Sequence, residues 1–158
     1  MKKIVLILML LCLCACGNNE SVAIQNQQNN IDTSKTGEYT YIDLFEATQK
    51  FKNGDEIIVA FTQELCGYCQ EFDYYYDLYR QDHYLNIYNV NLTNENRSEQ
   101  ENLEIIIQYW PTFYNTPGIY YCKDGKVVSS LTDHISYMDM EVLSTWVDEY
   151  NLLTIENK

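Results

Sequence analysis

The centre of the chain, from Glu56 to Tyr79, reads EIIVAFTQELCGYCQEFDYYYDLY. Its first part, residues 56–62, is a nearly continuous apolar run rich in β-branched side chains, which favours a central strand covered on both faces. A Cys-x-x-Cys motif formed by Cys66 and Cys69 comes next, and an aromatic-rich segment of helical period follows it. The sequence therefore predicts a strand that leads into a Cys-x-x-Cys motif at the beginning of a helix.

A Cys-x-x-Cys pair at the beginning of a helix is suited to thiol–disulfide exchange. The helix N-terminus carries partial positive charge and free N–H groups, so we expect Cys66 to have the lower thiol pKa and to act as the nucleophile. Cys69, one turn inside the helix and less exposed, would resolve the mixed disulfide with a substrate. A redox-active disulfide between Cys66 and Cys69 would then work without a further cofactor.

The same spacing also forms half of many zinc sites, which need two more nitrogen or sulfur ligands. Beyond the first sixteen residues, the remaining cysteine is Cys122 and the histidines are His83 and His134. No second Cys-x-x-Cys exists and the two histidines are far apart, so we expect no metal site and interpret both histidines as loop residues. Cys122 is expected to pack in the central sheet as a small apolar residue.

The N-terminus has the pattern of an export signal. Two lysines precede an apolar segment, residues 4–13, that is too short to cross a bilayer. The segment ends in Leu13-Cys14-Ala15-Cys16, which resembles the lipobox of bacterial lipoproteins. This resemblance implies that residues 1–15 are a signal peptide and that Cys16 carries a lipid anchor of diacylglycerol and palmitate. An ordinary signal peptide or an uncleaved anchor remains the alternative.

The rest of the chain divides into a tether and one domain. Residues 16–37 are rich in Asn, Gln and Ser without apolar periodicity, which is typical of a flexible tether. Residues 38–158 are long enough to form one domain with its own core. The formal net charge of −13 disfavours binding to nucleic acid and lying flat on an anionic membrane.

Periodicity and turn signals predict the element order α-β-α-β-α-β-β-α in the domain. Thr40 is expected to cap the first helix, which ends at Asn53-Gly54. The following elements are expected at residues 56–62 (strand), 66–81 (helix), 85–92 (strand), 99–109 (helix), 118–122 and 127–131 (a hairpin across an Asp-Gly turn) and 138–150 (helix). This order predicts an α/β protein with a mixed central sheet flanked by helices.

This order, with Cys-x-x-Cys after the first main strand and a proline before the hairpin, resembles the thioredoxin fold over about residues 38–155. The resemblance implies a cis proline that faces the disulfide and exposes backbone groups to an extended substrate. The candidates are Pro111 and Pro117, and we favour Pro117 because one strand and a tight turn follow it. By this resemblance Thr116, Pro117 and Tyr68 would contact the substrate.

Cys-Gly-Tyr-Cys with Thr-Pro also resembles the bacterial disulfide isomerase and reductase domains, and the chain is similar in plan to bacteriocin transport accessory proteins. One departure concerns Ala60, which stands where many reducing thioredoxins bury a carboxylate that helps to deprotonate the resolving cysteine. The direction of electron flow therefore stays open.

These resemblances imply a thiol–disulfide oxidoreductase at the cell membrane, lipid-anchored on the extracytoplasmic face. Its expected partners are protein or peptide thiols and disulfides and a membrane redox partner, and we expect a monomer. The alternative is a non-catalytic thioredoxin-like accessory or binding module in peptide or bacteriocin secretion, with a merely structural disulfide.

Overall fold

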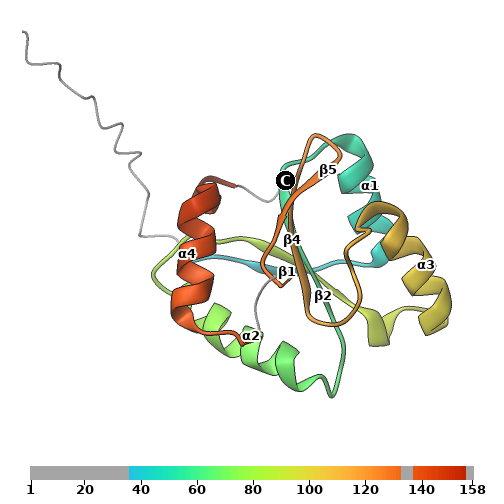
Figure 1. Cartoon of the computed structure of the whole chain (residues 1–158), viewed down its shortest axis with the longest axis horizontal. Coiled ribbons are helices and arrows are strands. Elements are labelled where there is room, and N and C mark those ends of the chain that lie inside the picture. The colour runs from blue at the N-terminus through green and yellow to red at the C-terminus, as the bar shows by residue number, and fades with distance from the viewer. Residues whose placement is uncertain (1–35, 133–136, 156–158) are drawn as a thin grey trace, which may run out of the picture.

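The middle layer of the molecule is a five-stranded mixed sheet in the order β1-β3-β2-β4-β5 (Figure 1). The strands are β1 (Tyr39–Tyr41), β2 (Ile57–Thr62), β3 (Ile87–Asn91), β4 (Gly118–Lys123) and β5 (Lys126–Ser130). β3 runs parallel to β1 and β2, whereas β4 is antiparallel to β2 and β5. β2 is the central strand, and all of its residues are buried, as its apolar sequence predicts.

The computed structural model describes residues 36–132 and 137–155. The predicted signal peptide, nearly all of the predicted tether, Cys16 and His134 lie outside the described residues. Within the described ranges, no helix combines the length and the apolar character needed to cross a membrane.

Helices cover both faces of the sheet (Figure 1). They are α1 (Leu44–Asn53), α2 (Gly67–Tyr79), α3 (Glu99–Tyr109) and α4 (Met140–Tyr150), with short 3₁₀ turns η1 (Leu92–Asn94) and η2 (Leu152–Thr154). α2 and α4 lie on one face, and α1 and α3 on the other. The predicted α/β architecture with a mixed sheet is confirmed.

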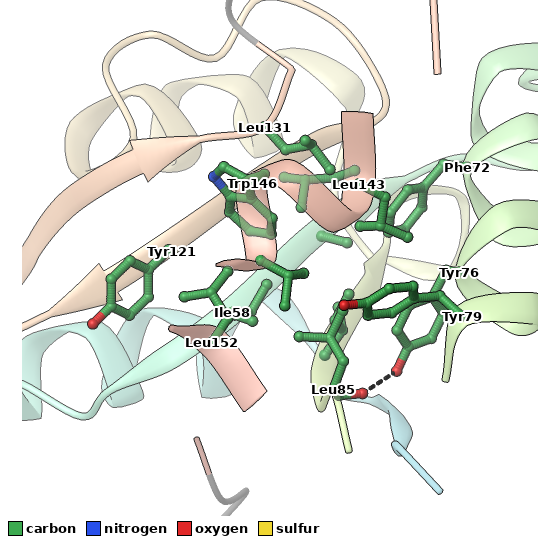
Figure 2. Packing of buried hydrophobic residues seen from close by; sticks show 14 of the residues in the cluster. Ile58, Phe72, Tyr76, Tyr79, Leu85, Tyr121, Leu131, Leu143, Trp146 and Leu152 are labelled. Atoms are coloured by element: carbon green, nitrogen blue, oxygen red, sulfur yellow. Dashed lines mark hydrogen bonds between the residues drawn. The ribbon is translucent and has the colours of Figure 1, made fainter. Parts of the chain in front are cut away.

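Each face of the sheet has its own apolar core because the side chains of β2 alternate between the faces. Ile58 and Ala60 pack toward α2 and α4, in one cluster with Phe72, Leu143 and Trp146. Figure 2 shows Ile58 among these side chains. On the opposite face, Phe61 packs against Trp110, with ring centroids 4.8 Å apart in an edge-to-face arrangement. This second core holds the end of α3 against the sheet.

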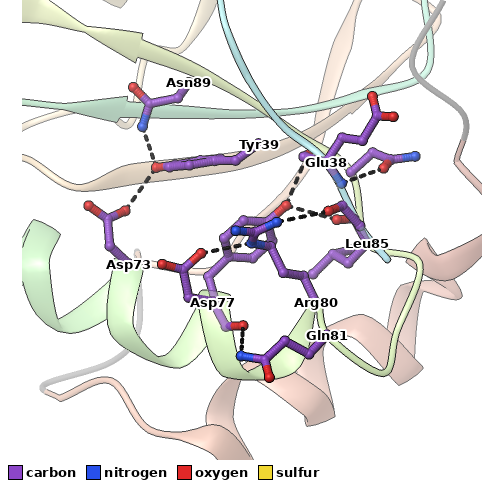
Figure 3. A network of polar contacts seen from close by, with 11 residues as sticks. Glu38, Tyr39, Asp73, Asp77, Arg80, Gln81, Leu85 and Asn89 are labelled. Atoms are coloured by element: carbon purple, nitrogen blue, oxygen red, sulfur yellow. Dashed lines mark hydrogen bonds and ion pairs between the residues drawn. The ribbon is translucent and has the colours of Figure 1, made fainter. Parts of the chain in front are cut away.

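A set of polar contacts joins α2 to the chain around β1 and β3 (Figure 3). The hydroxyl of Tyr76 lies 2.8 Å from the carbonyl oxygen of Leu85, and Arg80 donates to the carbonyl oxygen of Gly37 at 3.2 Å. Arg80 also forms an ion pair with Asp77 at 2.7 Å. These contacts fix the C-terminal half of α2, and with it the direction in which the helix presents its N-terminus.

Two local predictions are wrong: the cap of α1 at Thr40, and an element order that begins with a helix. The chain begins instead with β1, a strand that the sequence did not reveal, and Thr40 lies in this strand and does not cap α1. The cap is Asp43, whose side chain accepts a hydrogen bond from the backbone N–H of Glu46 at 2.7 Å. β1 has only three residues and pairs with β3 at the edge of the sheet, so its extended conformation depends on that distant partner. At the other end, Gly54 closes α1 in the left-handed region at φ 79°, as predicted.

Candidate functional site

Cys66 and Cys69 form a disulfide at the N-terminus of α2, with 5.2 Å between their Cα atoms. Cys66 is the N-cap residue, and its Sγ accepts a hydrogen bond from the backbone N–H of Cys69 at 3.1 Å. Cys66 is partly exposed, whereas Cys69 is 2% exposed. The first turn of α2 contains no acidic side chain, so no negative charge there opposes the partial positive charge of the helix N-terminus. The helix is thus arranged to favour a thiolate at the more accessible sulfur.

Thr116 lies directly beside the disulfide, and the peptide bond between Thr116 and Pro117 is cis. The Sγ of Cys66 lies 3.4 Å from the carbonyl oxygen of Thr116 and 3.5 Å from its hydroxyl. That hydroxyl also donates to the side-chain oxygen of Gln63 at 3.1 Å. The predicted choice of Pro117 over Pro111 is therefore confirmed, and backbone pairing in the sheet brings residues fifty positions apart into contact.

A hollow of about 220 Å³ lies beside this contact. Its lining includes the three residues predicted to contact substrate, Tyr68, Thr116 and Pro117. Glu71, Tyr114 and Tyr137 also line it. The side chains of all three tyrosines are more than 60% exposed.

Sequence reasoning missed Tyr114 and Tyr137 as members of this site. Leu65 is a further exposed apolar residue next to the motif; it is 97% exposed and has a φ of 59°. All three lie in connecting segments, where apolar periodicity carries no signal. Exposed apolar side chains around a reactive disulfide are suited to contact with a polypeptide.

Ala60 is fully buried on β2, so this strand supplies no carboxylate beneath the disulfide. A partly buried carboxyl group lies instead on α2 at Asp73, one helical turn after Cys69 and on the same face of the helix. It accepts a hydrogen bond from the hydroxyl of Tyr39 at 2.9 Å, and the side chain of Asn89 donates to that hydroxyl in turn (Figure 3). Burial raises the pKa of the Asp73 carboxyl above its ordinary value. Because Tyr39 and Asp73 are far apart in the sequence, this contact could not be predicted.

Cys122 is a free thiol in the interior, as predicted. It is 1% exposed in β4, and its Sγ accepts a hydrogen bond from the indole N–H of Trp110 at 3.3 Å. Burial raises the pKa of the Cys122 thiol to about 12, although the indole N–H acts in the opposite direction. This sulfur is therefore unsuited to exchange in the folded protein.

His83 lies in the loop after α2, as predicted, and its ring stacks on Tyr79 with 4.0 Å between the centroids. In the part of the chain that the structure describes, no three His, Cys, Asp or Glu side chains are grouped so as to hold a metal ion.

No protein-family model matches the chain, and no curated protein matches its sequence. Among solved structures, a mutant thioredoxin from Halobacterium salinarum is similar, with 16% sequence identity and a TM-score of 0.51 over 73% of this chain and 93% of that one. Thioredoxin f2 from Chlamydomonas reinhardtii is similar with 15% identity and a TM-score of 0.50 over 72% of this chain and 96% of that one. The mixed five-stranded sheet flanked by helices matches the fold of these thioredoxins. The chain therefore has the thioredoxin fold.

Proposed function

We propose that the chain is a thiol–disulfide oxidoreductase that acts on protein or peptide substrates through Cys66 and Cys69. The observation that carries this proposal is the position of the disulfide. Cys66 caps α2, is partly exposed, and lies 3.4 Å from the carbonyl oxygen of Thr116. An accessible sulfur at a helix N-terminus, next to a backbone segment open to a substrate, meets the requirements of disulfide exchange.

The exchange can run in either direction. In the dithiol state, the Cys66 thiolate attacks a substrate disulfide, forms a mixed disulfide and releases one substrate sulfur, which takes up a proton. Cys69 loses its proton, attacks Cys66, and releases the second substrate sulfur as a thiol. The substrate disulfide is thereby reduced to two thiols and the Cys66–Cys69 dithiol is oxidised to a disulfide. In reverse, a substrate dithiol is oxidised and Cys66–Cys69 is reduced.

Thr116, Pro117 and Tyr68 would hold the substrate during this exchange. Thr116 presents its backbone next to Cys66, and an extended substrate segment can pair with such a backbone as an added strand. Tyr68, two residues after Cys66 and 67% exposed, supplies an apolar surface with a polar tip beside this path.

We also propose that the domain is held at the extracytoplasmic face of the cell membrane by a lipid on Cys16. The support for this comes from the tetrad Leu13-Cys14-Ala15-Cys16 after a charged and then apolar N-terminus. A membrane redox partner would then return the Cys66–Cys69 pair to its working oxidation state. Mass spectrometry of the mature N-terminus tests the anchor, and an unmodified terminus downstream of Cys16 would overturn it.

The reduction potential of the Cys66–Cys69 pair tests the proposed activity. Equilibration with glutathione buffers, followed by alkylation and mass spectrometry, should give a potential above about −300 mV, the upper range of structural disulfides. The Cys69→Ser variant should accumulate a mixed disulfide with a peptide, because it lacks the resolving thiol. Cys122→Ser serves as the control and should exchange like the unaltered protein. A potential well below −300 mV would instead favour a binding module with a structural disulfide.

A further inference from the structure

The hollow beside the disulfide is lined by three tyrosine rings and one carboxylate, and the exchange chemistry does not account for this set of groups. The four residues are Tyr68 and Glu71 on α2, Tyr114 in the segment before β4, and Tyr137 shortly before α4. None of their side chains forms a hydrogen bond, an ion pair or a ring contact with another described residue. Four unpartnered groups from three segments of the chain therefore surround one hollow next to the reactive sulfur.

The hollow has the size of one amino-acid side chain. Its volume of about 220 Å³ is smaller than the roughly 300–1,000 Å³ of sites for drug-sized ligands. Pro117 and Met138 in its lining are buried, whereas the three tyrosines are mostly exposed, so the rings lie toward its mouth. An aliphatic stem can lie against such buried side chains while a polar head stays near the rings and the solvent.

The charge of the lining selects among possible side chains. Glu71 is the only charged residue among the described residues that line the hollow. A basic head can pair with this carboxylate and at the same time lie over a tyrosine ring. A neutral aromatic side chain would use the rings but leave the carboxylate unpaired, and an acidic side chain would be repelled. The formal net charge of −13 also attracts basic substrates over a longer range.

The hollow adjoins the path of a substrate that is bonded to Cys66. Thr116 lines the hollow, and its carbonyl oxygen lies 3.4 Å from the Sγ of Cys66. Glu71 follows Cys66 on α2 at a distance of about 7.5 Å along the helix axis, at 1.5 Å per residue. Two residues of an extended substrate span about 6.6 Å. A substrate side chain one or two residues from the reacting cysteine can therefore reach the hollow.

We propose that this hollow is a specificity subsite for a basic side chain, lysine or arginine, one or two residues from the reacting cysteine of the substrate. The inference rests on the proposed exchange activity and adds the substrate class to it. The stem of the basic side chain would lie along Pro117 and Met138. Its head would pair with Glu71 and lie against the rings of Tyr114 and Tyr137.

The test uses the reduced protein and disulfide-linked homodimers of short peptides, so that Cys66 meets the same peptide whichever sulfur it attacks. The reaction converts each peptide disulfide into two peptide thiols and oxidises Cys66 and Cys69 to their disulfide. Lysine, norleucine, phenylalanine or glutamate occupies one of the two positions before or after the cysteine. Norleucine keeps the aliphatic stem of lysine without its ammonium group. Dividing each second-order rate constant by the constant for dithiothreitol, a neutral dithiol, corrects for the intrinsic reactivity of each peptide.

At one of these positions, lysine should give a rate constant about fivefold higher than norleucine or phenylalanine, the combined effect of one exposed ion pair and one cation–π contact. Glutamate should give the lowest rate constant of the four. The preference for lysine should shrink at about 1 M salt, because salt screens exposed charges. A control peptide carries the same lysine about six residues from the cysteine, beyond the reach of the hollow. If this peptide reacts as fast as the best one, the preference reflects overall charge and the subsite is refuted.

Variants locate the preference. Glu71→Gln, Tyr114→Leu and Tyr137→Leu should each lower the lysine-to-norleucine ratio toward one, and these side chains have no hydrogen bond or ion pair among the described residues to lose. The matched controls are Glu64→Gln, in the exposed loop before the motif, and Tyr74→Leu, an exposed tyrosine of α2. Both controls lie outside the lining and should keep the fivefold ratio. If Glu64→Gln lowers the ratio as much as Glu71→Gln does, the inference is overturned.

A separate measurement with hydroxyethyl disulfide, a small uncharged reagent, distinguishes this inference from the proposed activity. If the unaltered protein reduces this reagent but treats lysine and norleucine peptides alike, the subsite is refuted and the exchange activity stands. If it reduces neither the reagent nor any peptide, the exchange activity itself is refuted.

Discussion

In the folded protein, the alkylation rate of Cys122 should be about three orders of magnitude lower than that of an ordinary accessible thiol. The perturbation is treatment with iodoacetamide at pH 8, and the magnitude follows from the raised pKa. With a pKa of about 12, against the ordinary 9.0, the thiolate fraction of Cys122 at pH 8 falls about a thousandfold. Only the thiolate reacts, and 1% exposure further limits access of the reagent to Sγ.

The double variant Cys66→Ser/Cys69→Ser leaves Cys122 as the cysteine of the described domain and isolates its rate. Labelling is followed by mass spectrometry of the peptide that contains residue 122, in buffer and in guanidinium chloride. The rate in the unfolded protein gives the reference for an accessible thiol. A rate in buffer within tenfold of this reference would refute the burial argument, and it would make Cys122 a candidate third redox sulfur.

Three further outcomes follow from the same structure. At pH 6 the Cys69→Ser variant, which retains Cys66, should react with iodoacetamide faster than the Cys66→Ser variant, which retains Cys69. Cys66 caps α2 and is the more exposed of the two cysteines. The opposite order of rates would reverse the assigned roles of Cys66 and Cys69. The hydroxyl of Tyr121 donates to Glu56 at 2.7 Å and lowers the pKa of that carboxyl, so this contact stabilises the fold above the ordinary carboxyl pKa and is lost as the pH falls. Tyr121→Phe should therefore lower the free energy of unfolding in urea by about 0.5–1 kcal/mol at pH 7, a small value because the Glu56 side chain is 40% exposed to solvent, and by less at pH 3. A loss of stability that does not depend on pH would contradict the assignment. Burial raises the pKa of Asp73, so its contribution to stability is complete at low pH and is lost as the pH rises through the raised pKa. Relative to the unaltered protein, Asp73→Asn should gain stability between pH 4 and pH 7 in urea titrations, and a difference that does not change with pH would show that this carboxyl titrates normally.

The sequence determined the features that depend on neighbours a few residues away. The bounds of α3 agree with the predicted residues 99–109, because its start is set by local groups: the Ser98 side chain accepts from the N–H of Glu101, whose carboxylate accepts from the N–H of Ser98. The Cys-x-x-Cys disulfide and its place at the start of α2 likewise follow from spacing and helix geometry. The choice of Pro117 over Pro111 needed, besides the resemblance to the thioredoxin fold, only the length of one strand and a turn.

Only the tertiary structure decided what depends on distant partners. β1 is extended because β3 pairs with it, and Thr40 therefore lies in a strand and does not cap α1. The contact between Tyr39 and Asp73 and the contact between Cys66 and Thr116 join segments whose separation along the chain carries no periodic signal. Local propensity and capping act over one helical turn, whereas such contacts form only when the buried faces of the sheet bring the helices together. The surroundings of the Cys66–Cys69 disulfide are therefore a property of the folded chain.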